Sequence, residues 1–343
     1  MSKLFKRLVA TFGVAVACVA HLQIAATPAS AQDARSYVMK LSCPTINDPS
    51  HEWLKRFAAA VEKDTGGRIK GEVYPASQLG SIPRQIEGVQ FGSIQGAIIP
   101  PEFLVGVDER YEALSAPGLF TSLDHLVRVL NDPPVRDLML GLGANKGLIG
   151  VALSPVGPSA IATRKPMRRI ADFKGLKIRV LASPFQLELI RRMDASPVAM
   201  SLGDVLPGLQ QGTIDGALAS VLIYTTMQYQ DAAKYVTETG QPYVSVIAVM
   251  SKRWLDSLPA DLQKIVREDA SKVSQDIIPF EKEFFEDQRT VWKNKGGELT
   301  SLPAAEQAAL MEKFATIADD MAKGKPELIK AVNLIAESAK RNK

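Results

Sequence analysis

The chain has 343 residues with 41 basic and 37 acidic side chains, which gives a formal net charge of +4. Lys3, Lys6 and Arg7 lie in the first 31 positions, which hold no acidic residue, so 38 basic and 37 acidic side chains remain beyond them. This near-neutral balance argues against nucleic acid or a membrane surface as a partner, because both require a concentrated basic face.

The first 31 residues have the pattern of a secretory signal peptide. Basic residues precede an apolar stretch over 8–20, and Ala29-Ser30-Ala31 ends the segment with small side chains. The apolar stretch is shorter than the roughly 20 residues that a membrane-spanning helix needs. We therefore predict cleavage after Ala31 and export from the cytoplasm. Beyond this segment Cys43 is the only cysteine, so we expect no intramolecular disulfide.

The first part of the remaining chain predicts a βαβαβ unit. Asp48-Pro49 is a typical helix start, with a capping side chain followed by a first-turn proline. Trp53 and Phe57 fall on one face of that helix, and Gly66 ends it. The expected elements are strands over 37–41, 69–74 and 94–99, and helices over 49–65 and 84–91.

The same order of elements recurs in the second half. Ser183-Pro184 predicts another helix start, and Ser201 with Asp204 approximates a capping box. The expected elements are strands over 176–181, 197–200 and 214–219, and helices over 184–193 and 201–211. Short crossover helices between such strands imply parallel pairing.

Several further segments connect and follow the two units. Residues 124–140 are helical in pattern and 148–154 form a buried strand, after which Pro155, Gly157 and Pro158 indicate a crossing point between domains. A β-rich run over 243–250 leads the chain back. From 260 to about 295 a helical pattern continues, interrupted only by Pro279, and more helix follows from 304.

One short motif occurs twice, about 120 residues apart. The run 90–98 (Gln-Phe-Gly-Ser-Ile-Gln-Gly-Ala-Ile) returns over 211–218 as Gln-Gly-Thr-Ile-Asp-Gly-Ala-Leu. Each copy predicts a helix ended by a glycine and followed by a small apolar strand. Two similar α/β halves leave a crevice at the carboxyl ends of their strands, where a ligand site is expected.

Catalytic and metal-binding motifs are scarce. His51-Glu52 lacks the second histidine of the zinc-protease motif, and no G-x-S-x-G nucleophile elbow is present. We therefore expect no catalytic residues, no metal and no cofactor. Arg179 is the most informative residue, because it lies near the carboxyl end of an otherwise apolar strand. Its guanidinium matches a carboxylate in two parallel hydrogen bonds.

The segment 172–180 (Asp-Phe-Lys-Gly-Leu-Lys-Ile-Arg-Val) resembles the D-x-K-G-L-K-I-R-V block of the DctP-type solute-binding proteins of tripartite ATP-independent periplasmic (TRAP) transporters. Segments 65–69, 78–81, 212–216 and 254–259 agree in order and spacing. The resemblance implies an α/β, two-domain, periplasmic-binding-protein-like fold, each domain a βαβαβ-based sheet, with a long helix spanning both. It also implies a monomeric receptor that closes on an organic acid and delivers it to a membrane permease.

We predict domain I over 32–156 plus 245–284 and domain II over 157–244 plus 285–343, with hinges near 156–157, near 241–244 and within the long helix. The resemblance gives Arg179 the role of clamping the ligand carboxylate. The other expected ligand contacts are Ser159, Tyr224, Ala219, Leu202, Phe103, Glu102, Pro100, Trp53 and His51.

Several positions depart from the family pattern. Ser159 stands where a second arginine is usual, Ala217 to Ala219 replace a Gln-Glu-Asn run, and Leu202 replaces a phenylalanine. These changes predict a pocket with few hydrogen-bond donors, and hence an aromatic or branched aliphatic monocarboxylate in preference to C4-dicarboxylates and sialic or uronic acids. The alternatives are an exported hydrolase or transferase, and a receptor that feeds a sensor kinase.

Overall fold

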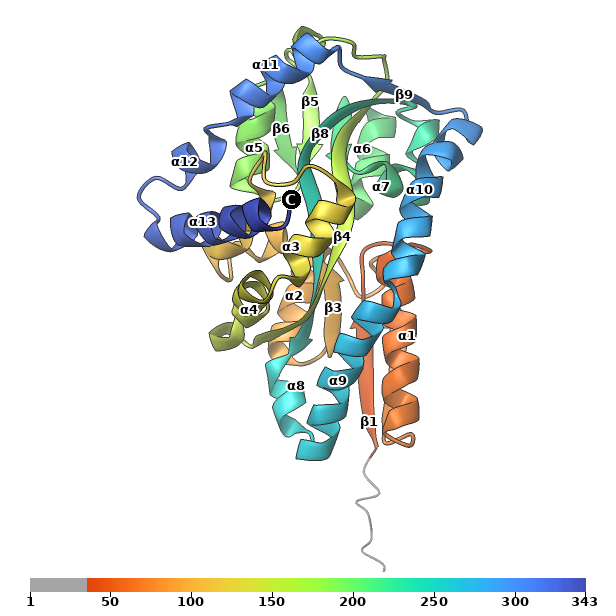
Figure 1. Ribbon diagram of the computed structural model, residues 1–343. Helices are drawn as coiled ribbons and strands as arrows, with labels where there is room; N and C mark the ends of the chain where they lie inside the picture. Colours follow the sequence, from red (N-terminus) through yellow and green to blue (C-terminus); the bar gives the residue numbers. More distant parts are fainter. Residues whose placement is uncertain (1–35) are drawn as a thin grey trace, which may run out of the picture. The chain divides into compact units, whose positions relative to one another are not determined.

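The computed structural model describes residues 36–343, which form one compact unit (Figure 1). The signal peptide and its cleavage site after Ala31 lie outside the described residues. Within 36–343, none of the helices is both long and apolar enough to cross a bilayer.

The strands and helices alternate along most of the chain. The strands are β1 Tyr37–Ser42, β2 Ile69–Tyr74, β3 Gly96–Ile99, β4 Leu148–Thr163, β5 Lys177–Val180, β6 Ser196–Ala199, β7 Gly216–Ala219, β8 Tyr235–Ser251 and β9 Glu298–Ser301. The helices are α1 Pro49–Asp64, α2 Ile82–Phe91, α3 Leu123–Asn131, α4 Pro133–Gly141, α5 Pro184–Arg191, α6 Val205–Gln211, α7 Val221–Thr226, α8 Lys252–Ser257, α9 Ala260–Asp276, α10 Ile278–Asn294, α11 Ala304–Phe314, α12 Ile317–Met321 and α13 Pro326–Arg341. Two 3-10 helices matter for the site, η1 Pro101–Leu104 and η2 Glu109–Ser115.

The strands form one sheet in the order β2-β1-β3-β8-β4-β7-β5-β6, and β9 pairs with β8. The two βαβαβ units lie at its two ends with the same internal order, β2-β1-β3 and β6-β5-β7, and their strands pair in parallel as predicted. The long strands β4 and β8 run antiparallel through the middle and belong to both halves. The sheets predicted for the two domains are therefore parts of one continuous sheet.

The repeated motif has the same structure in both halves. Gln95 donates its backbone N–H to the Lys40 carbonyl and accepts the Lys40 N–H on its side-chain oxygen. Asp215 makes the same pair of hydrogen bonds with Lys177. Each motif thus ties the helix end to the first strand of its own unit, which explains why an amide or carboxylate side chain occupies this position in both copies.

The helix ends preceding these contacts are also equivalent. Gly92 and Gly212 end α2 and α6 with φ of 84° and 77°, in the left-handed region that only glycine enters without strain. The prediction of two glycine-terminated helices is confirmed.

The strand predicted to end at 154 continues through the expected crossing point. β4 runs through Pro155, Gly157 and Pro158, and its pairing with β8 shifts register between Pro155 and Gly157 and again between Pro158 and Ala160. Prolines are tolerated here because each irregularity removes the ladder hydrogen bond that a proline cannot donate. The strand bends at these residues but does not end.

Two other predictions need correction. The helix expected over 124–140 is divided into α3 and α4, because Asp132 precedes Pro133 and takes an extended conformation, with ψ of 123°. The capping box at Ser201 and Asp204 is not formed, since neither side chain caps the turn or helix that follows it.

The long helix predicted from 260 is two helices that meet at Ile277. Pro279 has no N–H to donate, so the hydrogen-bond ladder is interrupted at the junction. α9 packs on α1 and α10 packs on α7, so the two segments contact different halves of the sheet (Figure 1). α13, which was assigned to domain II, packs on α3, α4 and η2 of the predicted domain I.

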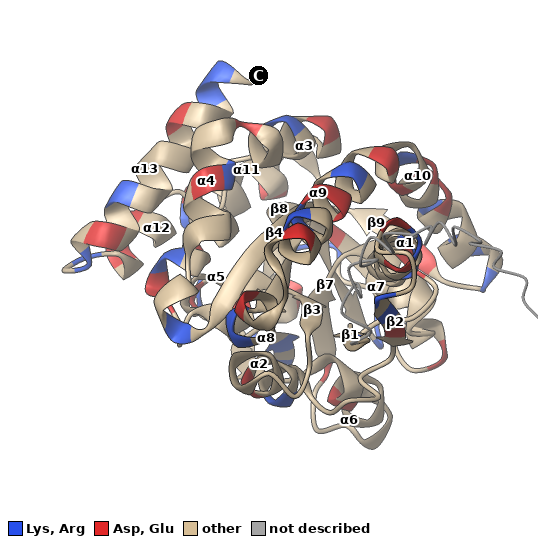
Figure 2. Ribbon diagram, turned by 90° about the horizontal axis from the view of Figure 1, so that it is seen from below, with Lys and Arg blue, Asp and Glu red and all other residues tan. Residues whose placement is uncertain are grey.

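Charged residues of both signs are interspersed along the outer helices, as Figure 2 shows for α9, α10 and α13. Most ion pairs among them are exposed and contribute little to stability.

Candidate functional site

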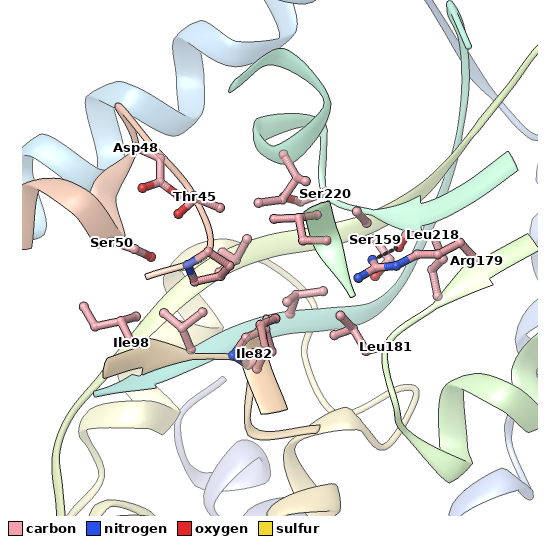
Figure 3. Close-up of a pocket in the computed structure, with 18 of the residues that line it drawn as sticks. Thr45, Asp48, Ser50, Ile82, Ile98, Ser159, Arg179, Leu181, Leu218 and Ser220 are labelled. Atoms are coloured by element: carbon pink, nitrogen blue, oxygen red, sulfur yellow. Dashed lines mark hydrogen bonds between the residues drawn. The ribbon is translucent and has the colours of Figure 1, made fainter. Parts of the chain in front are cut away.

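A cavity of about 50 Å³ lies at the carboxyl ends of the parallel strands, where the sequence predicts a ligand site. Its walls come from both halves of the sheet and from the segments that directly follow β1, β3, β5 and β7 (Figure 3). The lining residues are Pro44, Thr45, Asp48, Ser50, Ile82, Ile98, Pro100, Val156, Ser159, Arg179, Leu181, Gln186, Leu202, Leu218, Ala219, Ser220, Ile223, Val244 and Val246.

Arg179 extends from β5 into this cavity and is only 1% exposed. Its Nε donates to the Met200 carbonyl at 3.0 Å and its Nη1 to the Leu218 carbonyl at 3.4 Å. Nη2 has no hydrogen-bond partner within the described residues, and no carboxylate lies within ion-pair distance of the guanidinium there. Burial lowers the pKa of Arg179, because the low-polarity surroundings disfavour the charged form.

The arrangement leaves part of the guanidinium fork free. A guanidinium carries five N–H donors, of which two are used, so three remain on the edge formed by Nη1 and Nη2. Burying a cation without a counter-ion is costly. An anion with two oxygens would satisfy this edge, and a carboxylate has the matching geometry.

Three hydroxyl groups in the cavity wall are also buried without a hydrogen-bond partner: Thr45 Oγ1, Ser159 Oγ and Ser220 Oγ. Buried polar groups in folded proteins are nearly always paired, so several unpaired groups facing one cavity indicate a missing polar partner. Ser159 lies beside the Arg179 guanidinium, whereas Thr45 lies near Asp48 at the other end (Figure 3).

Two buried glutamates lie behind the cavity without lining it. Glu102 accepts a hydrogen bond from Ser115 Oγ at 2.6 Å, and burial raises its pKa to about 7, although the charge of Arg179 acts in the opposite direction. Glu112 accepts hydrogen bonds from Ser183 Oγ and the Phe185 N–H, both at 2.6 Å. Burial raises the pKa of Glu112 to about 8. Glu112 thereby caps α5 from the other predicted domain.

The predicted ligand residues fall into two groups. Those that line the cavity are Arg179, Ser159, Ala219, Leu202 and Pro100. Those that lie elsewhere are Tyr224, Phe103, Glu102, Trp53 and His51, and for these five the predicted contact with the cavity is not found.

The residues away from the cavity have other partners. The Tyr224 hydroxyl donates toward the Ala160 carbonyl at 2.5 Å and accepts the Ala219 N–H at 2.9 Å, so it ties β4 to β7. Trp53 stacks on Phe57 in the core, as expected for one face of an amphipathic helix.

His51 and Phe103 are likewise used for local structure. His51 Nδ1 accepts the Asn47 N–H at 3.2 Å beside the start of α1. Phe103 packs partly buried against the core.

Polar residues of the β1–α1 loop and of the turn after β7 line the cavity without having been predicted from the sequence. Thr45, Asp48 and Ser50 come from the first segment and Ser220 from the second. A usable signal was present, because each follows a predicted parallel strand at its carboxyl end. Asp48 was interpreted only as a helix cap, a role it also has.

A larger hollow of about 790 Å³ adjoins the cavity and shares Val156, Ser159 and Ser220 with it. Two ion pairs lie along this hollow, Asp124 with Lys282 at 2.9 Å and Glu238 with Arg289 at 2.5 Å. Because Ser159 lies beside Arg179, the hollow adjoins the Arg179 end of the cavity. Residues 36–343 contain no group of three or more His, Cys, Asp or Glu side chains placed to hold a metal ion.

Comparison with known proteins identifies the family. The model of the bacterial extracellular solute-binding protein family 7 (DctP) matches residues 43–325. The chain is 31% identical to an uncharacterized protein, YiiZ, of Salmonella typhimurium over 246 residues, covering 71% of this chain and 74% of the relative. It is 27% identical over 295 residues to the C4-dicarboxylate-binding periplasmic protein DctP of Rhodobacter capsulatus, covering 84% and 87%.

Solved structures agree with the fold. A TRAP periplasmic solute-binding protein from Desulfovibrio salexigens with bound orotic acid superimposes with a TM-score of 0.84 at 24% identity, over 90% of this chain and 100% of that one. One from Bradyrhizobium sp. with bound D-galacturonate has a TM-score of 0.82 at 26% identity, over 88% and 100%. The cavity, the buried Arg179 and the family match lead to one conclusion: this chain belongs to the DctP family of periplasmic TRAP solute-binding proteins, which are receptors and not enzymes.

Proposed function

We propose that this protein captures an organic acid by pairing its carboxylate with the free Nη1–Nη2 edge of Arg179. The unpaired, buried guanidinium is the observation that carries the proposal. Without an anion its desolvation is uncompensated, whereas a bound carboxylate supplies two charge-assisted hydrogen bonds. The Ser159 hydroxyl in the same wall is a further donor for the ligand.

A hydroxylated acid of the sugar-acid type is the first ligand class that we propose. The relatives named above bind C4-dicarboxylates and D-galacturonate, and the unpaired hydroxyls of Thr45, Ser159 and Ser220 offer partners for ligand hydroxyls. The sequence pattern predicts few such partners, because it does not place the loops after β1 and β7 at the cavity. With these hydroxyl donors in the wall, a hydroxylated ligand has hydrogen-bond partners there.

An aromatic or branched aliphatic monocarboxylate is the second candidate, and the apolar wall favours it. Twelve of the nineteen lining residues are aliphatic, proline or alanine side chains, among them Leu181, Leu218 and Val244. Burial of apolar ligand surface against them contributes roughly 25 cal/mol per Å². At about 10–15 Å³ per water, the cavity holds roughly three to five waters, so an acid of either class requires its walls to move apart.

We also propose that the lobes 32–156 plus 245–284 and 157–244 plus 285–343 close around the ligand, with α13 moving with the first lobe, on which it packs. The closed receptor then delivers the ligand to a TRAP permease. The register shifts of β4 near Gly157 and the break at Ile277 are the places where the chain can bend. Glu112 and α5 come from different lobes, so their buried hydrogen bonds form only when the lobes are together. A ligand that contacts both lobes stabilises that state.

Calorimetry with a panel of acids tests the ligand class. The panel contains D-galacturonate, D-glucuronate, L-malate, benzoate and isovalerate, with D-galactose as the control that lacks a carboxylate. Binding of the uronates, with none of galactose, supports the first class, and binding of benzoate or isovalerate alone supports the second. Binding of D-galactose as tight as that of D-galacturonate would contradict a carboxylate clamp.

A further inference from the structure

The cavity has polar groups at both ends. Arg179 and Ser159 lie at one end, Thr45, Asp48 and Ser50 lie at the other, and Ile82 and Leu181 lie between them in the view of Figure 3. We propose that the end formed by Thr45, Asp48 and Ser50, called here the distal end, binds a hydroxyl or N–H donor of the ligand. This inference rests on the proposed function, because it takes the ligand carboxylate to lie on Arg179.

Asp48 has acceptor capacity left for such a donor. Its Oδ1 accepts the His51 N–H at 3.0 Å as the N-cap of α1, and the residue is 3% exposed. An ionised carboxylate accepts hydrogen bonds at about four lone-pair positions, so acceptor capacity remains beyond the capping bond, the Thr45 hydroxyl and the residue's own backbone N–H. Thr45 Oγ1, next to this carboxylate, is buried and makes no hydrogen bond of good geometry.

The choice of aspartate is not explained by capping alone. Ser183 and Ser251 cap α5 and α8 from fully buried positions, each accepting a backbone N–H on its hydroxyl. Serine caps a helix about as well as aspartate does, and burying a hydroxyl costs far less than burying a carboxylate. A buried aspartate cap that faces a cavity therefore has a second role, and a ligand donor gives it one.

The charges around Asp48 set its specificity. Burial raises the pKa of Asp48, whereas the adjacent Thr45 hydroxyl, the His51 N–H and the charge of His51 favour the ionised form. Cys43 also lies close enough for the Asp48 charge to raise its pKa, and Glu52 and Lys55 act on His51 from the same helix. A ligand hydroxyl compensates the buried carboxylate, but a second ligand carboxylate places like charges together in a poorly solvated site.

Asp48 is thus a specificity residue that favours acids with a distal donor over dicarboxylates. Three pairs of acids test this, each with a hydroxyl or a carboxylate at the far end: 4-hydroxybutanoate and succinate, 4-hydroxybenzoate and terephthalate, and D-galacturonate and galactarate. Affinities are measured by calorimetry on the full mature chain. In whichever pair binds, the acid with the hydroxyl should bind at least about tenfold more tightly than its dicarboxylate partner. One hydrogen bond to a charged group accounts for a difference of this size.

Asp48→Asn should lower that ratio by about tenfold, because the amide keeps the cap but donates to a carboxylate. Asp48→Ser, which also keeps the cap, should weaken the hydroxyl member and tighten the dicarboxylate, because it removes both the acceptor for the hydroxyl and the like charge. Asp108→Asn is the matched control, since Asp108 caps η2 through the Arg110 N–H and does not line the cavity.

The outcomes separate the two proposals. Tighter binding of the dicarboxylates to the parent protein, or an unchanged ratio in both Asp48 variants, would overturn the role of Asp48 while the carboxylate receptor stands. No binding of any of the six acids, or binding that survives loss of Arg179, would contradict the proposed function as well.

Discussion

Replacing Arg179 with methionine separates what this residue does for the ligand from what it does for the fold. Methionine fills a similar volume without a charge, so the cavity wall is kept. In the free protein the change removes a buried cation that has no counter-ion, and we expect the melting temperature to stay the same or rise. If Arg179 only supported the fold, its replacement would lower the melting temperature.

The loss of affinity follows from the free edge of the guanidinium. Two charge-assisted hydrogen bonds at about 1.5 kcal/mol each give about 3 kcal/mol, which is more than a hundredfold in the dissociation constant. At a ligand concentration of about 100 times the parent dissociation constant, stabilisation by the ligand falls from about 2.7 kcal/mol to about 0.4 kcal/mol.

Isothermal calorimetry and thermal unfolding with and without D-galacturonate, or the best acid of the panel, measure both quantities. Arg84→Met is the matched control, because Arg84 is exposed and its ion pair among residues 36–343 is with Glu87 on the surface. An affinity within threefold of the parent, or a ligand-induced shift in melting temperature that is unchanged, would refute the assignment of Arg179 as the clamp.

Three other expectations follow. Small-angle scattering should give a smaller radius of gyration at saturating ligand, and an unchanged profile would argue against closure of the lobes. The pKa of Glu112 is raised from 4.5 to about 8, so its contribution to stability is full below about pH 4.5 and is lost as the pH rises through about 8. Glu112→Gln should therefore reduce the loss of stability between pH 5 and 9 by roughly 4 kcal/mol, at about 1.4 kcal/mol per pKa unit, and a pH profile parallel to that of the parent would contradict this. Gly216→Ala should destabilise by about 1–3 kcal/mol in denaturant unfolding, since its Cβ would come within 2.6 Å of the Ala162 carbonyl oxygen. Gly96→Ala should reduce the free energy of unfolding by less, because its added Cβ would meet the flexible Met250 side chain. An equal loss of stability in the two variants would refute this comparison.

The comparison of sequence with structure separates two kinds of information. Asp48 and Ser183 each cap a helix that the sequence predicted, and Gly92 and Gly212 end the helices of the repeated motif. These features depend on residues a few positions apart, so neighbouring side chains are enough to specify them.

Arg179 was found for a related reason. A charged residue inside an apolar strand can be identified from the sequence alone. Its position near the carboxyl end of the strand predicts that it lies at the crevice. The residues predicted around it were less reliable, because Tyr224 and Trp53 could be chosen only as aromatic side chains at plausible positions. The structure uses both of them in the core.

The sequence by itself thus determined the order of elements, the duplication and the arginine, all of which are encoded in local spacing. Only the tertiary structure decided which loops meet at the cavity, that β4 and β8 join both halves, and that Glu112 caps α5. Those contacts join residues that are tens to hundreds of positions apart, and pairing over such distances is set by packing of the whole chain. The same packing buries Arg179, Ser159 and Asp48 around one cavity, where polar groups without partners create the demand for a ligand.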